Sequence, residues 1–200
     1  MLAGLLMLAG GLGLAQQRNT APLGVIIPIQ GEINGANAAS LERRLKQAEE
    51  RGAAVVVLDI DTPGGEVSSA IRMADAILNT ATPSLAVVTN AFSAGALIAM
   101  SGEQVAMLPG SEIGAALPIT GTGQALEGVV GEKINSALRA KFRSVAETRG
   151  RPADLAEAMV NPNKVVPGVK ERGDILTLTA ADAVKLGVAN LQARTLNDAV

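Results

Sequence analysis

The sequence predicts an α/β fold with a mainly parallel sheet flanked by helices, and three observations support this prediction. Apolar, β-branched runs alternate with amphipathic stretches along most of the chain. Residues 53–60 are apolar almost throughout, which is typical of a strand buried on both faces of a parallel sheet. The chain has 200 residues with 48% hydrophobic content, enough for one compact domain and its core. Strands that alternate with helices imply right-handed crossovers between parallel strands.

In the first half of this domain, strands and helices are predicted to alternate. Residues 25–29 form a β-branched strand, and Pro28, which has no N–H to donate, indicates an edge of the sheet. A helix follows over residues 38–51, and Gly52 ends it. The apolar stripe of that helix consists of Ala39, Leu41, Leu45 and Ala48. The next elements are a strand at 53–60, a helix at 67–79, a strand at 85–88, a helix at 93–100 and a strand at 104–108.

The second half is predicted to begin with a long amphipathic helix over residues 131–149. Its apolar stripe consists of Ile134, Leu138, Phe142 and Val145. A short helix over 152–159 opens with Pro152 at its first position. The chain then continues with a strand at 175–178, a helix capped by Thr179 with Asp182 at the capping-box position, and a strand at 187–190.

The N-terminal residues 1–15 are uncharged and rich in Leu, Ala and Gly, which is typical of a targeting segment. We expect residues 1–20 to be a signal peptide or an N-terminal membrane segment, and residues 21–200 to be the folded domain. The run is shorter than the about 20 residues that a membrane span needs, which favours cleavage over anchoring. A buried first helix is the alternative. A targeting segment predicts a secreted or membrane-associated domain outside the cytoplasm.

Several residue types are absent, and their absence excludes whole classes of chemistry. The chain has no Cys, His, Trp or Tyr. Thiolate nucleophiles, disulfides, the usual zinc sites and a Ser-His-Asp triad are therefore impossible, and we expect neither a metal nor a cofactor. A reactive serine would need another base, for which lysine is the known substitute. With a net charge of −2 and 1% aromatic residues, the chain is not expected to bind nucleic acid.

Two glycine-containing loops follow predicted strands and lead into predicted helices. Residues 61–65, Asp-Thr-Pro-Gly-Gly, allow backbone N–H groups to point at an oxyanion beside a helix N-terminus. Ser93 lies in residues 90–96, Asn-Ala-Phe-Ser-Ala-Gly-Ala, at the next such junction. We expect Ser93 to be a nucleophile, and Gly65 and Ala94 to supply the oxyanion donors. Taken singly, the first loop also fits an ordinary turn, and Ser93 also fits an N-cap.

Lys133 is the candidate base, because it is predicted in the first turn of the long helix. There the positive end of the helix dipole and partial burial both disfavour an ammonium ion. A solvated surface lysine is the alternative. Among the other lysines, Lys164 and Lys170 fall in a polar segment that is a candidate flap.

Other residues offer weaker alternatives. Ser101 is a second candidate nucleophile, since it is predicted to be exposed at a helix end, although no oxyanion donors are expected there. Asp59 and Asp61 frame a strand end, where they fit a turn better than a metal site in a chain without His.

Together these motifs resemble the membrane-bound serine peptidases of the NfeD group, partners of stomatin-like proteins, which are similar to ClpP and signal peptide peptidase A. The resemblance covers residues 24–190 and depends on four features occurring in order. They are Asp61 to Gly65, Phe92-Ser-Ala-Gly95, Ile113-Gly114 and Lys133. It implies a ClpP/crotonase-like spiral of βαβ units, with a Ser93–Lys133 dyad and oxyanion donors at Gly65 and Ala94. It also implies cleavage of apolar polypeptide segments in membrane-associated proteins, a stomatin-like partner, and a homodimer or higher homo-oligomer.

Two other functions remain compatible with the sequence. A crotonase-type enzyme would use the same oxyanion site to polarise the thioester of an acyl-CoA. A catalytically weak scaffold would bind a stomatin-like partner through an apolar groove.

Overall fold

The computed structural model describes residues 23–121, 123, 124, 126 and 128–199, so the predicted targeting segment lies outside the described residues. The strands are β1 (Gly24–Gln30), β2 (Val55–Thr62), β3 (Ser84–Phe92), β4 (Gln104–Gly114), β5 (Thr177–Thr179) and β6 (Leu191–Gln192). The helices are α1 (Gly35–Glu50), α2 (Val67–Asn79), α3 (Ala94–Ser101), α4 (Gly128–Thr148), α5 (Ala153–Ala158), α6 (Ala180–Lys185) and α7 (Leu196–Ala199).

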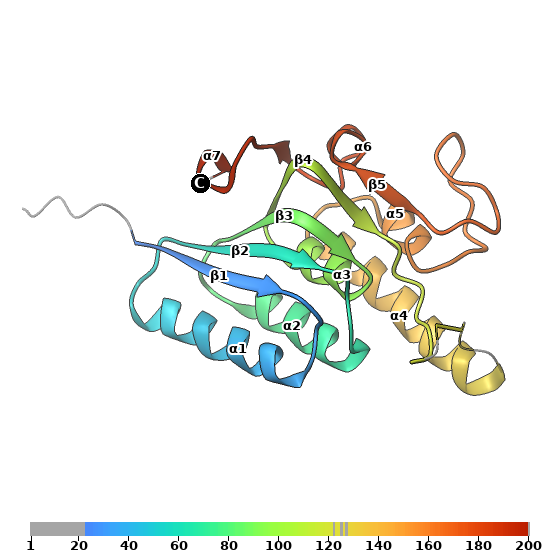
Figure 1. The fold of residues 1–200 in the computed structure, drawn as a ribbon, viewed down its shortest axis with the longest axis horizontal. Coiled ribbons are helices and arrows are strands. Elements are labelled where there is room, and N and C mark those ends of the chain that lie inside the picture. Colours follow the sequence, from blue (N-terminus) through green and yellow to red (C-terminus); the bar gives the residue numbers. More distant parts are fainter. Residues whose placement is uncertain (1–22, 122, 125, 127, 200) are drawn as a thin grey trace, which may run out of the picture.

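The sheet is mainly parallel, which confirms the predicted α/β fold (Figure 1). Its order is β1-β2-β3-β4-β5, and β6 also pairs with β4. The first four strands are parallel to one another, whereas β5 runs antiparallel to β4. β1 lies at the edge of the sheet, as Pro28 predicted. Because parallel strands end at the same side, the loops after β2 and β3 lie next to each other.

Helices α1 to α4 lie on one side of the sheet (Figure 1). Alternate residues of the strands, such as Ile27, Leu58 and Val88, are fully buried in the main core on that side. A smaller cluster covers part of the other face, where Val57 and Val87 pack with the C-terminal segment around Ala193. Both faces of the central strands are therefore buried, as the apolar run of residues 53–60 predicted.

The boundaries of several elements differ from the predicted ones. Helix α1 begins at Gly35 rather than at residue 38, because the Asn34 side chain accepts hydrogen bonds from the N–H groups of residues 36 and 37. The buried stripe therefore includes Ala38 in place of Ala39. Pro152 is the N-cap of α5 rather than its first residue. β3 and β4 are longer than predicted, and the last strand lies at Leu191–Gln192 rather than at 187–190.

The strand pairing is interrupted near the ends that carry the two loops. Between β2 and β3 the register shifts after Ile60. Between β3 and β4, Val88 pairs with Met107 but Asn90 pairs with Glu112. Residues 108–111 of β4 thus form an irregular excursion opposite a single residue of β3. On either side of these shifts, the strands pair in a regular register.

Two buried cations bind main-chain carbonyl groups. Arg151 is 7% exposed and donates to the carbonyls of Val188, Met100 and Glu103 at 3.0, 3.1 and 3.2 Å. Burial, and after it the charge of Arg149, lowers the pKa of Arg151 to about 10, so Arg151 remains protonated at neutral pH. This guanidinium ties the end of α3 to the segment before β6.

Lys170, in the segment predicted to be a candidate flap, is 4% exposed. Its Nζ donates to the carbonyls of Lys164, Pro162 and Glu171 at 2.6, 3.0 and 3.0 Å. Three carbonyls satisfy all three donors of an ammonium group. The segment is therefore an ordered loop built around Lys170.

In the described part of the chain, every helix is too short or too polar to cross a bilayer.

Candidate active site

Ser93 lies in a strained turn between β3 and α3. Its φ of 52° and ψ of −118° fall in a region that residues with a side chain rarely adopt. Such strain costs about 1–3 kcal/mol and clusters at functional sites. A sharp strand-to-helix turn of this kind holds a serine hydroxyl away from the backbone, as in the nucleophile elbow of hydrolases. The N–H of Ser93 donates to the carbonyl of Gly114 at 2.9 Å, which attaches the turn to the end of β4.

The loop after β2 passes so close to Ser93 that only glycine fits. A Cβ atom added at Gly64 would lie 2.5 Å from the Cβ of Ser93. At Gly65, φ is +150° and an added Cβ would lie 2.2 Å from the carbonyl oxygen of Ile33. The N–H of Ile33 donates to Gly64 at 2.7 Å, and the N–H of Glu66 donates to Ile33 at 2.8 Å. The loop is therefore fixed between residue 33 and the turn that contains Ser93.

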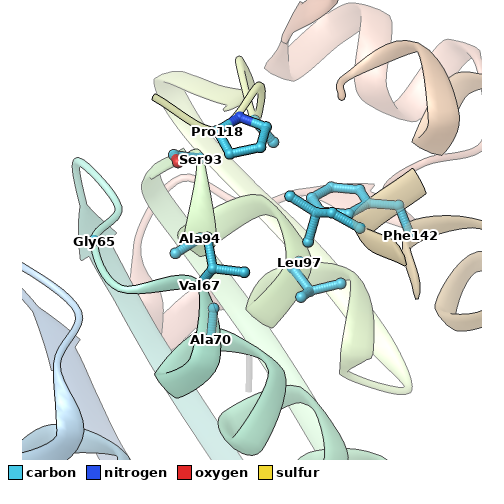
Figure 2. A pocket seen from close by; sticks show the side chains of 10 residues that line it. Gly65, Val67, Ala70, Ser93, Ala94, Leu97, Pro118 and Phe142 are labelled. Atoms are coloured by element: carbon cyan, nitrogen blue, oxygen red, sulfur yellow. The ribbon is translucent and has the colours of Figure 1, made fainter. Parts of the chain in front are cut away.

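The two candidate oxyanion donors lie beside Ser93. Gly65, Ser93 and Ala94 line one hollow, as the two loops predicted (Figure 2). Among the described residues, the N–H groups of Gly65 and Ala94 have no hydrogen-bond acceptor. Two unpaired N–H groups beside a half-buried hydroxyl are suited to bind an oxygen atom that becomes negative.

The hollow beside Ser93 is apolar. Val67, Leu97 and Phe142 point into it from α2, α3 and α4 (Figure 2). Ala70, Ala116, Pro118 and Leu138 complete the wall. Its free volume is only about 20 Å³, so a small apolar side chain fits it better than a large one. Ligand-binding pockets are commonly lined by apolar side chains of this kind.

A larger cleft of about 510 Å³ opens on the outer side of Ser93. Residues 115 and 117–121, after β4, line one part of the cleft, and Glu32 and Pro63 line another. Glu32 supplies the one charged side chain that lines this cleft among the described residues. Asn37 donates to the main-chain carbonyl of Glu32 at 2.8 Å, which holds that residue in place.

The carboxylate of Glu66, the residue directly after Gly65, is already hydrogen-bonded. It accepts hydrogen bonds from Ser68 at 2.6 Å and from Ser69 at 2.5 Å. These two bonds hold the pKa of Glu66 below its usual value. The Glu66 carboxylate is therefore tied to the first turn of α2 and is a poor candidate for a base.

Lys133 lines neither the hollow nor the cleft at Ser93. Helix α4 begins at Gly128, so Lys133 lies in its second turn rather than its first, and its side chain is exposed rather than partly buried. It lines a separate shallow hollow on α4. Ile134, predicted to be in the buried stripe, is also 36% exposed. Of the predicted site residues, the structure thus brings together Gly65, Ser93 and Ala94 within one chain.

The alternative candidates have structural roles. Ser101 is fully buried rather than exposed, and its hydroxyl donates to the carbonyl of Leu97 at 2.8 Å, which removes it as a nucleophile. Asp61 accepts a hydrogen bond from Asn90 at 2.9 Å, and Asp59 accepts one from Gln30 at 3.4 Å. No group of three or more acidic residues within the described ranges is placed to hold a metal ion.

The family of the chain follows from its sequence. Residues 24–200 match the model of the NfeD1b N-terminal domain. The chain belongs to this family. It is 36% identical over 177 residues to the membrane protein NfeD1b of Bacillus subtilis (strain 168), covering 88% of this chain and 40% of that protein. It is 30% identical over 180 residues to the membrane-bound protease PH1510 of Pyrococcus horikoshii, covering 86% of this chain and 38% of that protein. The chain thus spans about two fifths of the length of either relative.

Solved structures place this NfeD1b-type domain in the ClpP/crotonase-like fold. A mutant of the 1510-N membrane-bound stomatin-specific protease superposes with a TM-score of 0.76 at 28% identity, covering 89% of this chain and 83% of that one. A lysine-to-alanine mutant of that protease, in complex with a substrate peptide, superposes with a TM-score of 0.75 at 28% sequence identity. The match covers 88% of this chain and 78% of that one. ClpP1 of Listeria monocytogenes shares the fold, with a TM-score of 0.66 at 19% identity over 86% of this chain and 92% of that one.

Proposed function

We propose that the chain is a serine endopeptidase in which Ser93 is the nucleophile and Lys133 the general base. The observation that carries the proposal is the strained Ser93 turn, which lines one hollow together with Gly65 and Ala94, whose N–H groups are unpaired among the described residues. A binding surface has no need of a strained serine, whereas acyl transfer needs both the hydroxyl and the oxyanion donors. Kinship with a protein named as a membrane-bound protease supports the same conclusion.

The proposed reaction proceeds in two halves. The amine of Lys133 takes the hydroxyl proton as Ser93 Oγ bonds to the carbonyl carbon, and the carbonyl oxygen becomes an oxyanion held by Gly65 and Ala94. The ammonium then gives its proton to the leaving nitrogen as the C–N bond breaks. Water then attacks the resulting ester as its proton passes to the amine, and the ammonium returns a proton to Ser93 Oγ as the C–Oγ bond breaks and the acid product leaves.

The proposed substrate is an apolar segment of a membrane-associated polypeptide. The apolar lining of the hollow beside Ser93 supports a small apolar residue before the cleaved bond. A similar solved protease is named as specific for a stomatin homologue, which makes a stomatin-like protein the first natural substrate to test. The relatives are named as membrane proteins, which supports membrane association. We also propose that this domain lies outside the cytoplasm.

The acyl-enzyme provides a direct test. An apolar peptidyl ester, incubated with the protein and analysed by intact mass and peptide mapping, should leave an acyl group on Ser93. Binding of a stomatin-like protein without any adduct or cleavage would select the scaffold function. Binding of an acyl-CoA with no peptide cleavage would select the crotonase-type function.

Substitution of Gly65 by Ala should abolish most of the activity. The new Cβ would meet the Ile33 carbonyl, and L-residues are strained at this φ. The displaced N–H should lower kcat by about 100-fold or more, the usual effect of losing one oxyanion donor. Steady-state cleavage of an apolar fluorogenic peptide measures this effect. Gly52→Ala is the matched control, because Gly52 also has a positive φ but open space around it, and it should keep full activity.

Glu32 should favour peptides with a basic residue near the cleaved bond. A carboxylate at the rim attracts a cation and repels an anion, so kcat/KM should differ by about tenfold between Lys-flanked and Glu-flanked peptides at low salt. In Glu32→Lys, the Glu-flanked peptide should have the higher kcat/KM. Glu50→Lys makes the same change of charge on an exposed part of α1 and should leave the order unchanged. An unchanged peptide ratio in Glu32→Lys would contradict the prediction.

A further inference from the structure

A buried threonine lies between the two loops of the candidate site. Thr62 ends β2 and is 1% exposed, which leaves it no surface for a substrate. Its side chain contacts Gly64 and Gly95. The first of these glycines directly precedes Gly65 and the second directly follows Ala94, the two proposed oxyanion donors. Any effect of Thr62 on the reaction therefore has to act through the segments that carry these donors.

The hydroxyl of Thr62 joins the loop after β2 to the end of β1. It donates to the carbonyl of Gly31 at 2.6 Å and accepts a hydrogen bond from the N–H of Gly64 at 3.0 Å. The carbonyl of Gly64 is farther away, at 3.4 Å, so the single proton of the hydroxyl is directed to Gly31. The loop is thus held from inside the protein as well as from its surface.

Two successive peptide units lead to the donor at Gly65, and a hydrogen bond holds each of them. Thr62 holds the first through the N–H of Gly64, and Ile33 holds the second by donating to the carbonyl of Gly64 at 2.7 Å. In a planar trans peptide unit the C=O and N–H groups point in opposite directions, so the second bond aims the N–H of Gly65 away from Ile33. The two units are joined at a glycine with a φ of +106°, and glycine rotates freely unless both sides are held.

The methyl group of Thr62 faces the other loop. A Cβ atom added at Gly95 would lie 2.5 Å from Cγ2 of Thr62, so the methyl group packs directly against the main chain of Gly95. Gly95 lies in the first turn of α3, one residue after the N–H of Ala94. Because protein interiors are closely packed, this contact sets how near the start of α3 lies to the end of β2.

We propose that Thr62 is a positioning residue that sets the spacing and direction of the two oxyanion donors. The hydroxyl orients the peptide units that lead to the N–H of Gly65, and the methyl group sets the approach of Ala94. The inference rests on the proposed function, in which both N–H groups bind one oxygen atom as it becomes negative. Such donors act at about 2.7–3.1 Å from that oxygen, so a small shift of either loop weakens one of the two bonds.

Two substitutions separate the hydroxyl of Thr62 from its methyl group. Thr62→Val removes the hydroxyl and leaves the buried N–H of Gly64 unpaired. We expect kcat for an apolar fluorogenic peptide to fall at least about tenfold with KM within about twofold, because the donors act on the transition state. Thr62→Ser keeps the hydroxyl and should retain kcat to within about threefold. If the added methyl group of Thr62→Val prevents folding, Thr62→Ala removes the same hydroxyl without adding an atom, and the same loss is expected.

A peptide aldehyde reports on the donors directly. Ser93 Oγ bonds to its carbonyl carbon as the hydroxyl proton passes to the carbonyl oxygen, and this oxygen then lies at the donors as in the transition state. The matching peptide alcohol has no carbonyl and reports on binding alone. In Thr62→Val the inhibition constant of the aldehyde should rise by about the factor by which kcat/KM falls, and that of the alcohol should stay within about twofold. A purely structural role of Thr62 would raise both constants alike or leave both unchanged, and either result would overturn the inference.

A compensating pair of substitutions tests the methyl contact. Gly95→Ala places a Cβ atom 2.5 Å from Cγ2 of Thr62 and should lower kcat at least about tenfold. Thr62→Ser removes that methyl group, and the next nearest atom to the new Cβ is 3.6 Å away. The double variant should therefore recover to within about threefold of Thr62→Ser alone. A double variant as impaired as Gly95→Ala would show that this contact does not set the spacing.

These measurements separate the inference from the proposed function. A wild-type protein that cleaves no peptide and binds the aldehyde no better than the alcohol would count against the proposed function itself. An active wild-type protein with an equally active Thr62→Val variant would overturn the inference and leave Ser93 as the nucleophile. Ser101→Ala is the matched control, because it removes another buried hydroxyl that donates to a main-chain carbonyl, at the far end of α3. It should leave kcat and both inhibition constants unchanged.

Discussion

Ser93→Ala should abolish peptide cleavage while leaving the fold intact. Removal of the hydroxyl removes the atom that forms the acyl-enzyme, and we expect kcat to fall by at least about 10³-fold. The half-buried hydroxyl has no hydrogen-bond partner among the described residues, so its loss should cost little stability. Kinetics with an apolar peptide and far-UV circular dichroism measure the two effects.

Ser93→Gly separates the strain of the turn from its chemistry. Glycine adopts positive φ without the steric cost that alanine retains, but it also increases the entropy of the unfolded chain. We expect Ser93→Gly to be equally inactive, yet more stable to urea than Ser93→Ala by about 1 kcal/mol. Ser101→Ala is the matched serine control and should keep its activity. Substantial cleavage by Ser93→Ala would rule out the assigned nucleophile.

Arg151→Met should cause the largest loss of stability. The guanidinium donates to three main-chain carbonyls from two segments, with two of the three hydrogen bonds buried, and an apolar side chain would leave those acceptors unpaired. We expect a loss of about 3 kcal/mol or more in the free energy of unfolding. A change of that size lowers the melting temperature by roughly 6–12 °C in a domain of this length.

Arg194→Met is the control for Arg151→Met, since the Arg194 side chain is 90% exposed and its ion pair with Asp198 is a surface contact. It should change the free energy of unfolding by less than about 0.5 kcal/mol. Equal melting temperatures for the two variants, measured by calorimetry, would show that Arg151 does not join α3 to the C-terminal segment.

The sequence predicted the fold class, the position of the first strand at the edge of the sheet, and the two loops of the candidate site. These features depend on local signals. The apolar run at residues 53–60 indicates a strand buried on both faces, and Pro28 is excluded from central strands. The joint occurrence of Gly65 and Ser93 after successive strands placed them at one sheet edge, because parallel strands end together.

Other features depend on contacts between distant segments, which local patterns do not contain. Helix α1 begins earlier than predicted because the Asn34 side chain caps it, and its buried stripe therefore includes Ala38 rather than Ala39. The surroundings of Lys133 could not be predicted, because helical periodicity gives the relative direction of side chains but not which side packs against the domain. Glu32 gave no signal at all, since it reaches the Ser93 cleft only through the pairing of its neighbour Ile33 with the loop after β2.

The interrupted register separates the loops of the cleft from the regularly paired part of the sheet. Regular pairing ends after Ile60 in β2 and after Val88 in β3, and the loops with Gly65 and Ser93 follow those breaks. A substitution on the loop side alters what the cleft accepts without disturbing the apolar pairs on the other side. Substitutions in the cleft of this chain should therefore change what it binds with little effect on its melting temperature.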